Sequence, residues 1–266
     1  MDRRNLIRFG AAATLATLTT TGSAQAPQRT FVLVAGAFSG GWIWARVAQR
    51  LRSAGHRVFS PTLTGLGDRA HLMSASITMD TLVQDIVAVV ETEELQDAIL
   101  VGSSFGGIPA GGAADVVGNR LRKLIYLDSI LGEPGKSAFD ALPAEVVAAR
   151  RKLAQESSGG VSLPPPPTSA YGALGLTDAS DIAWCQRRFT PHPIGSYESA
   201  LGPRYGSNGV PKTYVACLAP GFGAIAPSRA WAKQQSGWRW VEMNTGHLPM
   251  ITAPDELTRL LVTLAQ

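Results

Sequence analysis

Gly102-Ser103-Ser104-Phe105-Gly106 is the stretch that decides the fold, because it has the G-x-S-x-G spacing of a nucleophile elbow. In such an elbow a strand turns sharply into a helix, and the central serine takes a strained backbone conformation. The residues two places to either side must lack bulk so that strand and helix can approach each other. Ser104 is therefore a candidate nucleophile.

The sequence around this motif supplies the context that the motif requires. Residues 98–101 are a short apolar run typical of a buried strand, and residues 107–117 are small and apolar enough to form a closely packed helix. The amides at the start of that helix would stabilise an anionic intermediate on Ser104. By itself the pattern could arise by chance in a chain with 28 glycines, so this context carries the interpretation.

Length, composition and charge bound the remaining classes. A chain of 266 residues with 45% hydrophobic and 17% charged residues is a globular protein with one sizeable core and room for an elaboration. The net charge is +4, and the first eight residues contribute +2 of it, so the remainder carries too little charge to indicate a nucleic-acid partner. Only Cys185 and Cys217 occur, which excludes a disulfide-based fold.

Residues 1–26 have the composition of an export signal. The pair Arg3-Arg4 precedes a weakly apolar stretch, and Ala24-Gln25-Ala26 forms a small-x-small cleavage site before Pro27. This order predicts a twin-arginine signal and a periplasmic or secreted bacterial protein; the alternative is an uncleaved amphipathic tail. No later stretch reaches about 18 apolar residues, so we expect no membrane insertion of the mature chain.

Short apolar runs alternate with segments of helical period along residues 27–128 and 211–266. Such alternation is typical of an α/β fold with a mostly parallel central sheet and helices on both faces. The expected strands are 30–34, 57–61, 98–101, 123–128, 213–218 and 238–243. The expected helices are 42–53, 78–91, 107–117 and one that starts at 254.

Residues 129–210 interrupt this alternation. They contain a helix-like segment at 143–156 and four consecutive prolines at 164–167, and no strand repeat is apparent. We interpret the segment as a cap inserted over the carboxyl ends of the sheet. The predicted division is an export signal at 1–26, an α/β core at 27–128 and 211–266, and a cap at 129–210.

A nucleophilic serine needs a base within hydrogen-bond reach, and histidine is the obvious candidate. His247 follows the last predicted strand, so it emerges at the edge where sites in parallel sheets form; the alternative is that it caps the last helix. His56 lies in a turn at the opposite end and is expected to be solvated. His71 lies on a loop that could reach substrate, and His192 stands between prolines and is expected to be structural.

The base needs an orienting acid, and the usual position lacks one. Residues 219–224, which follow the strand expected at 213–218, contain no carboxylate. Asp128 ends the strand after the nucleophile instead, and it can reach the far nitrogen of His247 because the strand ends converge. The alternative is that Asp128 caps the first turn of the cap or pairs with a basic residue.

Two backbone amides are expected to hold the oxyanion. One belongs to Phe105, directly after the nucleophile, and the other to Ala37 in the glycine-rich loop after the first strand. We found no sequence pattern for a metal or a cofactor and expect none.

Together these residues resemble the α/β-hydrolase superfamily, and more narrowly the group of plant methylesterases, hydroxynitrile lyases and their bacterial esterase relatives. The resemblance implies Ser104 as nucleophile, His247 as base, and Ala37 and Phe105 as oxyanion donors. Phe222 stands about where many relatives carry the acid. Bacterial relatives that end the strand with Tyr-Leu-Asp, as at 126–128, also tend to lack that acid. The resemblance rests on residues 34–44, 61–67, 102–107, 126–128 and 246–247.

Relatives that act as hydroxynitrile lyases carry a lysine after the catalytic histidine and a threonine in the first loop. The present chain has Leu248 and Gly36 at those positions, which favours ester hydrolysis. We therefore predict a serine esterase that cleaves small to medium hydrophobic carboxylic esters or lactones; the alternatives are carbon-carbon bond chemistry on the same fold and a non-catalytic ligand-binding relative. Apolar cap residues could line the substrate pocket or the core; they are Tyr171, Leu174, Trp184 and Phe189.

Overall fold

A six-stranded sheet in which every strand pair is parallel forms the centre of the molecule. The structure is a computed structural model that describes residues 27–133, 135–202 and 209–266, so the predicted export signal lies outside the described residues. The strands of the sheet are β1 (Thr30–Val34), β2 (Arg57–Phe59), β3 (Ala98–Ser103), β4 (Leu121–Leu127), β7 (Lys212–Cys217) and β8 (Arg239–Met243).

The strand order is β2-β1-β3-β4-β7-β8, with β3 in the interior of the sheet. Ser103 at the end of β3 pairs with Leu127 at the end of β4, so the residues that follow these two strands start side by side. The prediction of an α/β fold with a mostly parallel central sheet is confirmed. All six strands were expected from the sequence, with ends that differ by a few residues.

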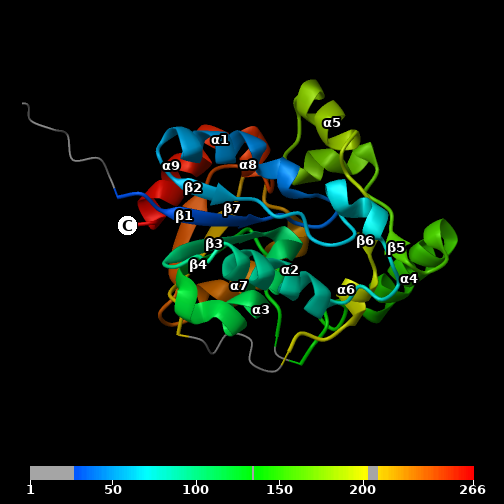
Figure 1. Cartoon of the computed structure of the whole chain (residues 1–266). Helices are drawn as coiled ribbons and strands as arrows, with labels where there is room; N and C mark the ends of the chain where they lie inside the picture. Colours follow the sequence, from blue (N-terminus) through cyan, green and yellow to red (C-terminus); the bar gives the residue numbers. More distant parts are fainter. Residues whose placement is uncertain (1–26, 134, 203–208) are drawn as a thin grey trace, which may run out of the picture.

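Helices cover both faces of this sheet (Figure 1). One face carries α1 (Ala45–Ser53), α8 (Pro249–Thr252) and α9 (Pro254–Leu264), and the other carries α2 (Met79–Thr92), α3 (Gly107–Val117) and α7 (Ala226–Lys233).

Within the described ranges, no helix combines the length and the apolar character that crossing a membrane requires.

The alternation of side chains along each strand divides the core into two layers. Phe31 and Leu33 of β1 pack with the helices on the α1 side, whereas Val32 and Val34 pack with those on the α2 side. All six residues of β3 are buried, as expected for an interior strand covered on both faces. The apolar runs seen in the sequence therefore lie where the elbow needs rigid support.

The described helices of the segment between β4 and β7 lie beyond the carboxyl ends of the strands (Figure 1). It contains α4 (Ala144–Ser158), α5 (Ala179–Gln186) and α6 (Gly195–Glu198). The sequence shows no strand repeat here, and the structure adds, within the described residues, a single small antiparallel pair, β5 (Ser162–Leu163) with β6 (His192–Pro193). Strands of two residues are too short to show an alternating pattern. The division into core and cap domains stays a prediction.

Short 3-10 helices complete the described chain. They are η1 (Gly41–Trp44), η2 (Gly67–Leu72), η3 (Ser104–Gly106), η4 (Gly118–Arg120), η5 (Thr168–Leu174) and η6 (Gly223–Ile225).

Candidate active site

Ser104 occupies a sharp turn between β3 and α3. β3 ends at Ser103, Ser104 has a backbone φ of +53°, and α3 begins at Gly107 after the single turn of η3. A left-handed conformation is unfavourable for serine and persists only where the surrounding structure holds it. The turn thus has the strained strand-to-helix geometry that the G-x-S-x-G spacing predicts.

The glycines of the elbow are required by close backbone contacts. A Cβ atom added to Gly106 would lie 2.3 Å from the carbonyl oxygen of Ala35, and one added to Gly102 would lie 2.8 Å from that of Gly106. Contacts this short cannot be relieved without moving the backbone. Because Ala35 follows β1, the glycines bring the loop after β1 against the elbow.

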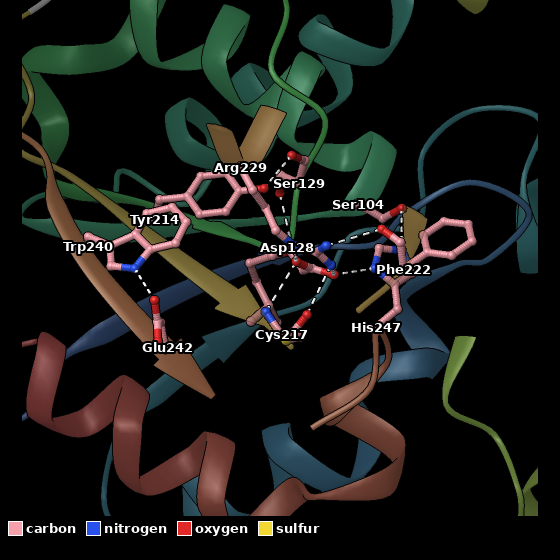
Figure 2. Close-up of polar contacts among 11 residues, drawn as sticks. Ser104, Asp128, Ser129, Tyr214, Cys217, Phe222, Arg229, Trp240, Glu242 and His247 are labelled. Atoms are coloured by element: carbon pink, nitrogen blue, oxygen red, sulfur yellow. Dashed lines mark hydrogen bonds and ion pairs between the residues drawn. The ribbon is translucent and has the colours of Figure 1, made fainter. Parts of the chain in front are cut away.

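His247 connects Ser104 to Asp128 through both ring nitrogens (Figure 2). Its Nε2 lies 2.9 Å from the Ser104 Oγ, and its Nδ1 lies 2.7 Å from Oδ2 of Asp128. Asp128 is fully buried, and His247 is 2% exposed. The structure therefore brings together the three residues that the sequence predicts as nucleophile, base and acid. Along the chain, Asp128 is 119 residues and Ser104 is 143 residues from His247.

The environment of Asp128 sets the direction of these hydrogen bonds. Burial opposes ionisation of this carboxyl group, but hydrogen bonds from His247 and Arg229 outweigh burial and hold the pKa of Asp128 below its usual value. A carboxylate only accepts hydrogen bonds, so Nδ1 of His247 carries the proton and donates it. The Nε2 lone pair is then left to accept the hydrogen bond of the Ser104 hydroxyl.

Arg229, on α7, is the residue of this site that the sequence analysis missed. Its Nε donates to Oδ1 of Asp128 at 2.7 Å, its Nη2 donates to Oδ2 at 2.8 Å, and Nη2 also donates to the carbonyl of Cys217 at 2.9 Å (Figure 2). The interpretation that Asp128 pairs with a basic residue was an alternative to its contact with His247. The structure contains both contacts, because Arg229 donates to both carboxylate oxygens and His247 donates to Oδ2 as well.

Phe222 lies over the histidine, at the position where many relatives carry their acid. Its ring centroid is 4.6 Å from that of His247, and its carbonyl accepts a hydrogen bond from Nη1 of Arg229 at 3.2 Å. An apolar ring at this place shields one side of the imidazole from water. The carboxylate reaches the imidazole from β4 instead.

The loop after β1 lies directly against Ser104. A Cβ atom on Gly36 would be 2.8 Å from the Cβ of Ser104, and Ala37 and Phe105, the predicted oxyanion donors, both line the cavity next to Ser104. Their function as donors stays a prediction. Phe38, which follows them in this loop, has a φ of +64° and is held by residues before α6.

His192 is one of the residues that hold this loop. The backbone N–H of Phe38 donates to its Nδ1 at 3.2 Å, and its Nε2 lies 3.0 Å from the Ser196 hydroxyl. Full burial lowers the pKa of His192 to about 3, so the ring is neutral. The backbone N–H of Thr190 also donates to the Phe38 carbonyl, at 2.9 Å. His192 is structural, as the sequence predicts.

The other two histidines lie away from the site. His56 is buried, and its Nδ1 accepts the backbone N–H of Arg29 at 3.2 Å. The expectation of a solvated His56 is therefore wrong, because the chain entering β1 covers the turn. His71 is exposed and does not line the cavity.

A cavity of about 350 Å³ opens at Ser104 and His247, and its walls are mainly apolar. Of the four apolar residues singled out in the sequence, Leu174 and Phe189 line it, whereas Tyr171 and Trp184 do not. Tyr171 is buried against Phe189, with ring centroids 5.6 Å apart, and Trp184 packs on Trp42 at 4.9 Å. Leu174 and Phe189 therefore line the pocket, whereas Tyr171 and Trp184 pack against other aromatic side chains.

Residues 31–260 match the model of the alpha/beta hydrolase family. The chain belongs to this family. This match confirms the predicted superfamily. It covers almost the whole of the described chain, including the nucleophile elbow. Hydrolysis is therefore the reaction that the family membership indicates.

Relatives of this hydrolase include a bacterial and a plant enzyme. A carbendazim hydrolyzing esterase of Nocardioides sp. is 37% identical over 245 residues, which cover 88% of this chain and 98% of the relative. An alpha-hydroxynitrile lyase of Arabidopsis thaliana is 36% identical over 102 residues, covering 38% of this chain and 40% of the relative. An extracellular alpha/beta-hydrolase from a Paenibacillus species has the same fold, with a TM-score of 0.76 at 23% identity over 88% of this chain and 98% of the other.

Proposed function

We propose that this hydrolase is a serine esterase in which Ser104, His247 and Asp128 form the catalytic triad. The observation that carries the proposal is the hydrogen-bonded chain from Ser104 Oγ through both nitrogens of His247 to Asp128, which opens on an apolar cavity. A nucleophile, a base within 2.9 Å and an acid that orients the base are the geometry of nucleophilic acyl transfer.

Acylation starts when Ser104 Oγ attacks the carbonyl carbon of the ester while Nε2 of His247 takes the hydroxyl proton. The negative charge that develops on the carbonyl oxygen is stabilised by the backbone amides of Ala37 and Phe105. Asp128 stabilises the imidazolium and keeps the ring in the required tautomer. When the tetrahedral intermediate collapses, His247 gives its proton to the leaving alcohol.

Deacylation repeats these steps with water as the nucleophile. His247 removes a proton from a water molecule, the resulting tetrahedral intermediate uses the same two amides, and the carboxylic acid leaves as Ser104 regains its proton. The bond between Ser104 Oγ and the acyl carbon, which forms during acylation, is thus broken during deacylation. His247 transfers the proton in each step.

The cavity supports small to medium hydrophobic esters or lactones as substrates. A volume of about 350 Å³ is at the lower end for small-molecule sites, and apolar side chains such as Leu163, Leu174 and Phe189 cover most of its wall. The activity of the Nocardioides relative, which is named for carbendazim hydrolysis, fits a compact substrate of this kind.

Two positions argue against the lyase alternative. Leu248 follows the histidine where the lyases carry a lysine, so no cation is available there to stabilise departing cyanide. Gly36 stands where the lyases carry a threonine, and a side chain at this position would collide with Ser104 in the present backbone.

Labelling with a fluorophosphonate tests the proposal together with hydrolysis of p-nitrophenyl butyrate. We expect both in the parent protein and neither in Ser104→Ala. Ser103→Ala is the matched control, because this buried neighbour has no hydrogen-bond partner for its hydroxyl within the described chain. A parent protein that neither labels nor hydrolyses esters would show that the fold has lost this chemistry.

We also propose that residues 1–26 direct export by the twin-arginine route, on the grounds of Arg3-Arg4 and the site after Ala26. Expression in a bacterium should give a periplasmic protein that begins at Pro27. Replacing both arginines with lysine should retain it in the cytoplasm. Uncleaved protein in the cytoplasm of the parent strain would contradict the proposal.

A further inference from the structure

Arg150, on α4, stands out among the residues that line the cavity. Among the described residues that line the cavity, His247, Tyr197 and Arg150 have titratable side chains, and Arg150 carries a permanent positive charge. Most of the remaining lining is apolar, and it includes Leu153, which lies three residues further along α4. An apolar wall strengthens the field of a single charge, because little polarisable material screens it.

The guanidinium of Arg150 has no acidic partner among residues 27–133, 135–202 and 209–266. Its contact is with an aromatic face, since Cζ lies 5.5 Å from the ring centroid of Tyr197. The two basic residues that follow it on α4 are both paired, Arg151 with Glu198 at 2.7 Å and Lys152 with Glu156 at 3.8 Å. Among the three basic residues of α4, Arg150 is thus the one without an acidic partner in the described ranges.

Aromatic packing connects Arg150 to the nucleophile. The Tyr197 ring packs on Phe105 with centroids 4.4 Å apart, and Phe105 directly follows Ser104. Two ring contacts, of 4.4 Å and 5.5 Å, therefore separate the elbow from the guanidinium. Because Ser104 and Arg150 line the same cavity, a substrate of moderate length can place its ester at Ser104 and a second group at Arg150.

We propose that Arg150 forms an anion subsite, so that the preferred substrates are esters that carry one carboxylate separated from the scissile carbonyl by an apolar spacer. This inference rests on the proposed esterase function and specifies its substrate class. A guanidinium binds a carboxylate through two parallel hydrogen bonds, which gives orientation as well as affinity. The apolar residues that line this cavity accommodate the spacer.

The test compares monomethyl and dimethyl esters of dicarboxylic acids from succinate to sebacate. The readout is the ratio of kcat/KM for the monoanionic ester to that for the neutral ester of the same length. We expect the ratio to exceed one and to peak at one spacer length, and to fall about 10- to 100-fold in Arg150→Gln, the effect of losing a charge-assisted hydrogen bond. High salt should lower the ratio in the parent protein.

Lys152→Gln is the matched control, since it removes one positive charge from the same helix at a side chain that is 76% exposed. It should leave the ratio unchanged. A ratio that is equal in the parent and in Arg150→Gln at every length would overturn the anion subsite while leaving the esterase function intact. The ratio is internal to each variant, so a general loss of activity in Arg150→Gln does not alter it.

A binding measurement separates failure of the inference from failure of the proposed function. If no ester is hydrolysed, calorimetry with suberic acid mono-N-methylamide and its neutral diamide tests the subsite alone. Tighter binding of the monoanion to the parent than to Arg150→Gln supports the subsite. Equal binding of both compounds to both proteins rejects it.

Discussion

Arg229 donates hydrogen bonds to both carboxylate oxygens of Asp128, from Nε to Oδ1 at 2.7 Å and from Nη2 to Oδ2 at 2.8 Å. The oxygen that receives Nη2 also accepts the hydrogen bond from His247. A third donor, the backbone N–H of Cys217, reaches Oδ1 at 3.2 Å. The orientation of Asp128 is therefore determined by contacts from α7 and β7 as well as by β4, which it follows.

Replacing Arg229 with methionine should lower kcat by on the order of 10², because Asp128 is then free to rotate away from His247. The loss is smaller than that for a triad member, since the carboxylate remains. The pKa of Asp128 should rise when this cation is removed, so the part of the acid limb of the kcat/KM profile that reports protonation of Asp128 should move to higher pH. Steady-state kinetics between pH 4 and 9 measure both effects.

Arg229→Lys is the control for charge alone. It keeps a cation near Asp128 but loses the two-pronged contact, so the acid limb should return toward the parent position while kcat recovers only in part. If Arg229→Met has the parent pH profile and lower stability, Arg229 is a structural residue without influence on the acid.

Asp128→Asn should lower kcat by roughly 10⁴, because an amide favours the wrong tautomer of His247. His247→Ala should have a similar or larger effect. The comparison with Asp255→Asn, which affects a surface ion pair with Arg50, controls for the loss of a carboxylate elsewhere. An Asp128→Asn enzyme with more than a tenth of the parent kcat would show that another group orients the base.

The fold and most of the site were predictable because they depend on local signals. Runs of apolar residues gave the strands, and the elbow spacing fixed Ser104 at the end of one of them. His247 and Asp128 follow from this, since residues after parallel strands meet at a common edge. Knowing that each strand is parallel to its neighbours is enough to place His247 and Asp128 at the same edge of the sheet as Ser104.

The contacts that escaped prediction depend on how separate elements pack. Arg229 and Asp128 are 101 residues apart, and no spacing in the sequence relates a residue on α7 to the end of β4. His56 is buried because the segment before β1 covers it. The sequence of the turn around His56 gives no sign of this contact. The pair β5–β6 escaped for a simpler reason, namely that a strand of two residues has no period.

Gly36→Ala should lower kcat/KM for esters at least 10-fold. The new methyl group would lie 2.8 Å from the Cβ of Ser104, so either the nucleophile or the loop that carries Ala37 must move. Gly172→Ala is the matched control, because a Cβ at that glycine meets no atom within 4 Å. Equal activity of Gly36→Ala and the parent would show that the first loop tolerates displacement without loss of oxyanion stabilisation.

His192 links the loop after β1 to the segment before α6, and its burial has a consequence for stability. Burial lowers its pKa in the folded protein to about 3, whereas the unfolded chain has the ordinary value of 6.5. Between these two values the unfolded chain binds a proton that the folded chain does not. The contribution of neutral His192 to stability is therefore fully present above pH 6.5 and is lost progressively as the pH falls toward 3.

His192→Asn should make the free energy of unfolding less dependent on pH in this window. Asparagine offers an acceptor near the position of Nδ1 for the Phe38 N–H but has no group that titrates there. The histidine should cost the parent about 2 kcal/mol between pH 7 and 5, at about 1.4 kcal/mol per pH unit below 6.5, and the variant should be spared this loss. Urea unfolding at both pH values gives the comparison, and His71→Asn, at an exposed histidine, serves as the control. Equal losses of stability in the parent and in His192→Asn would mean that His192 takes up its proton in the folded protein, with the Phe38 contact broken.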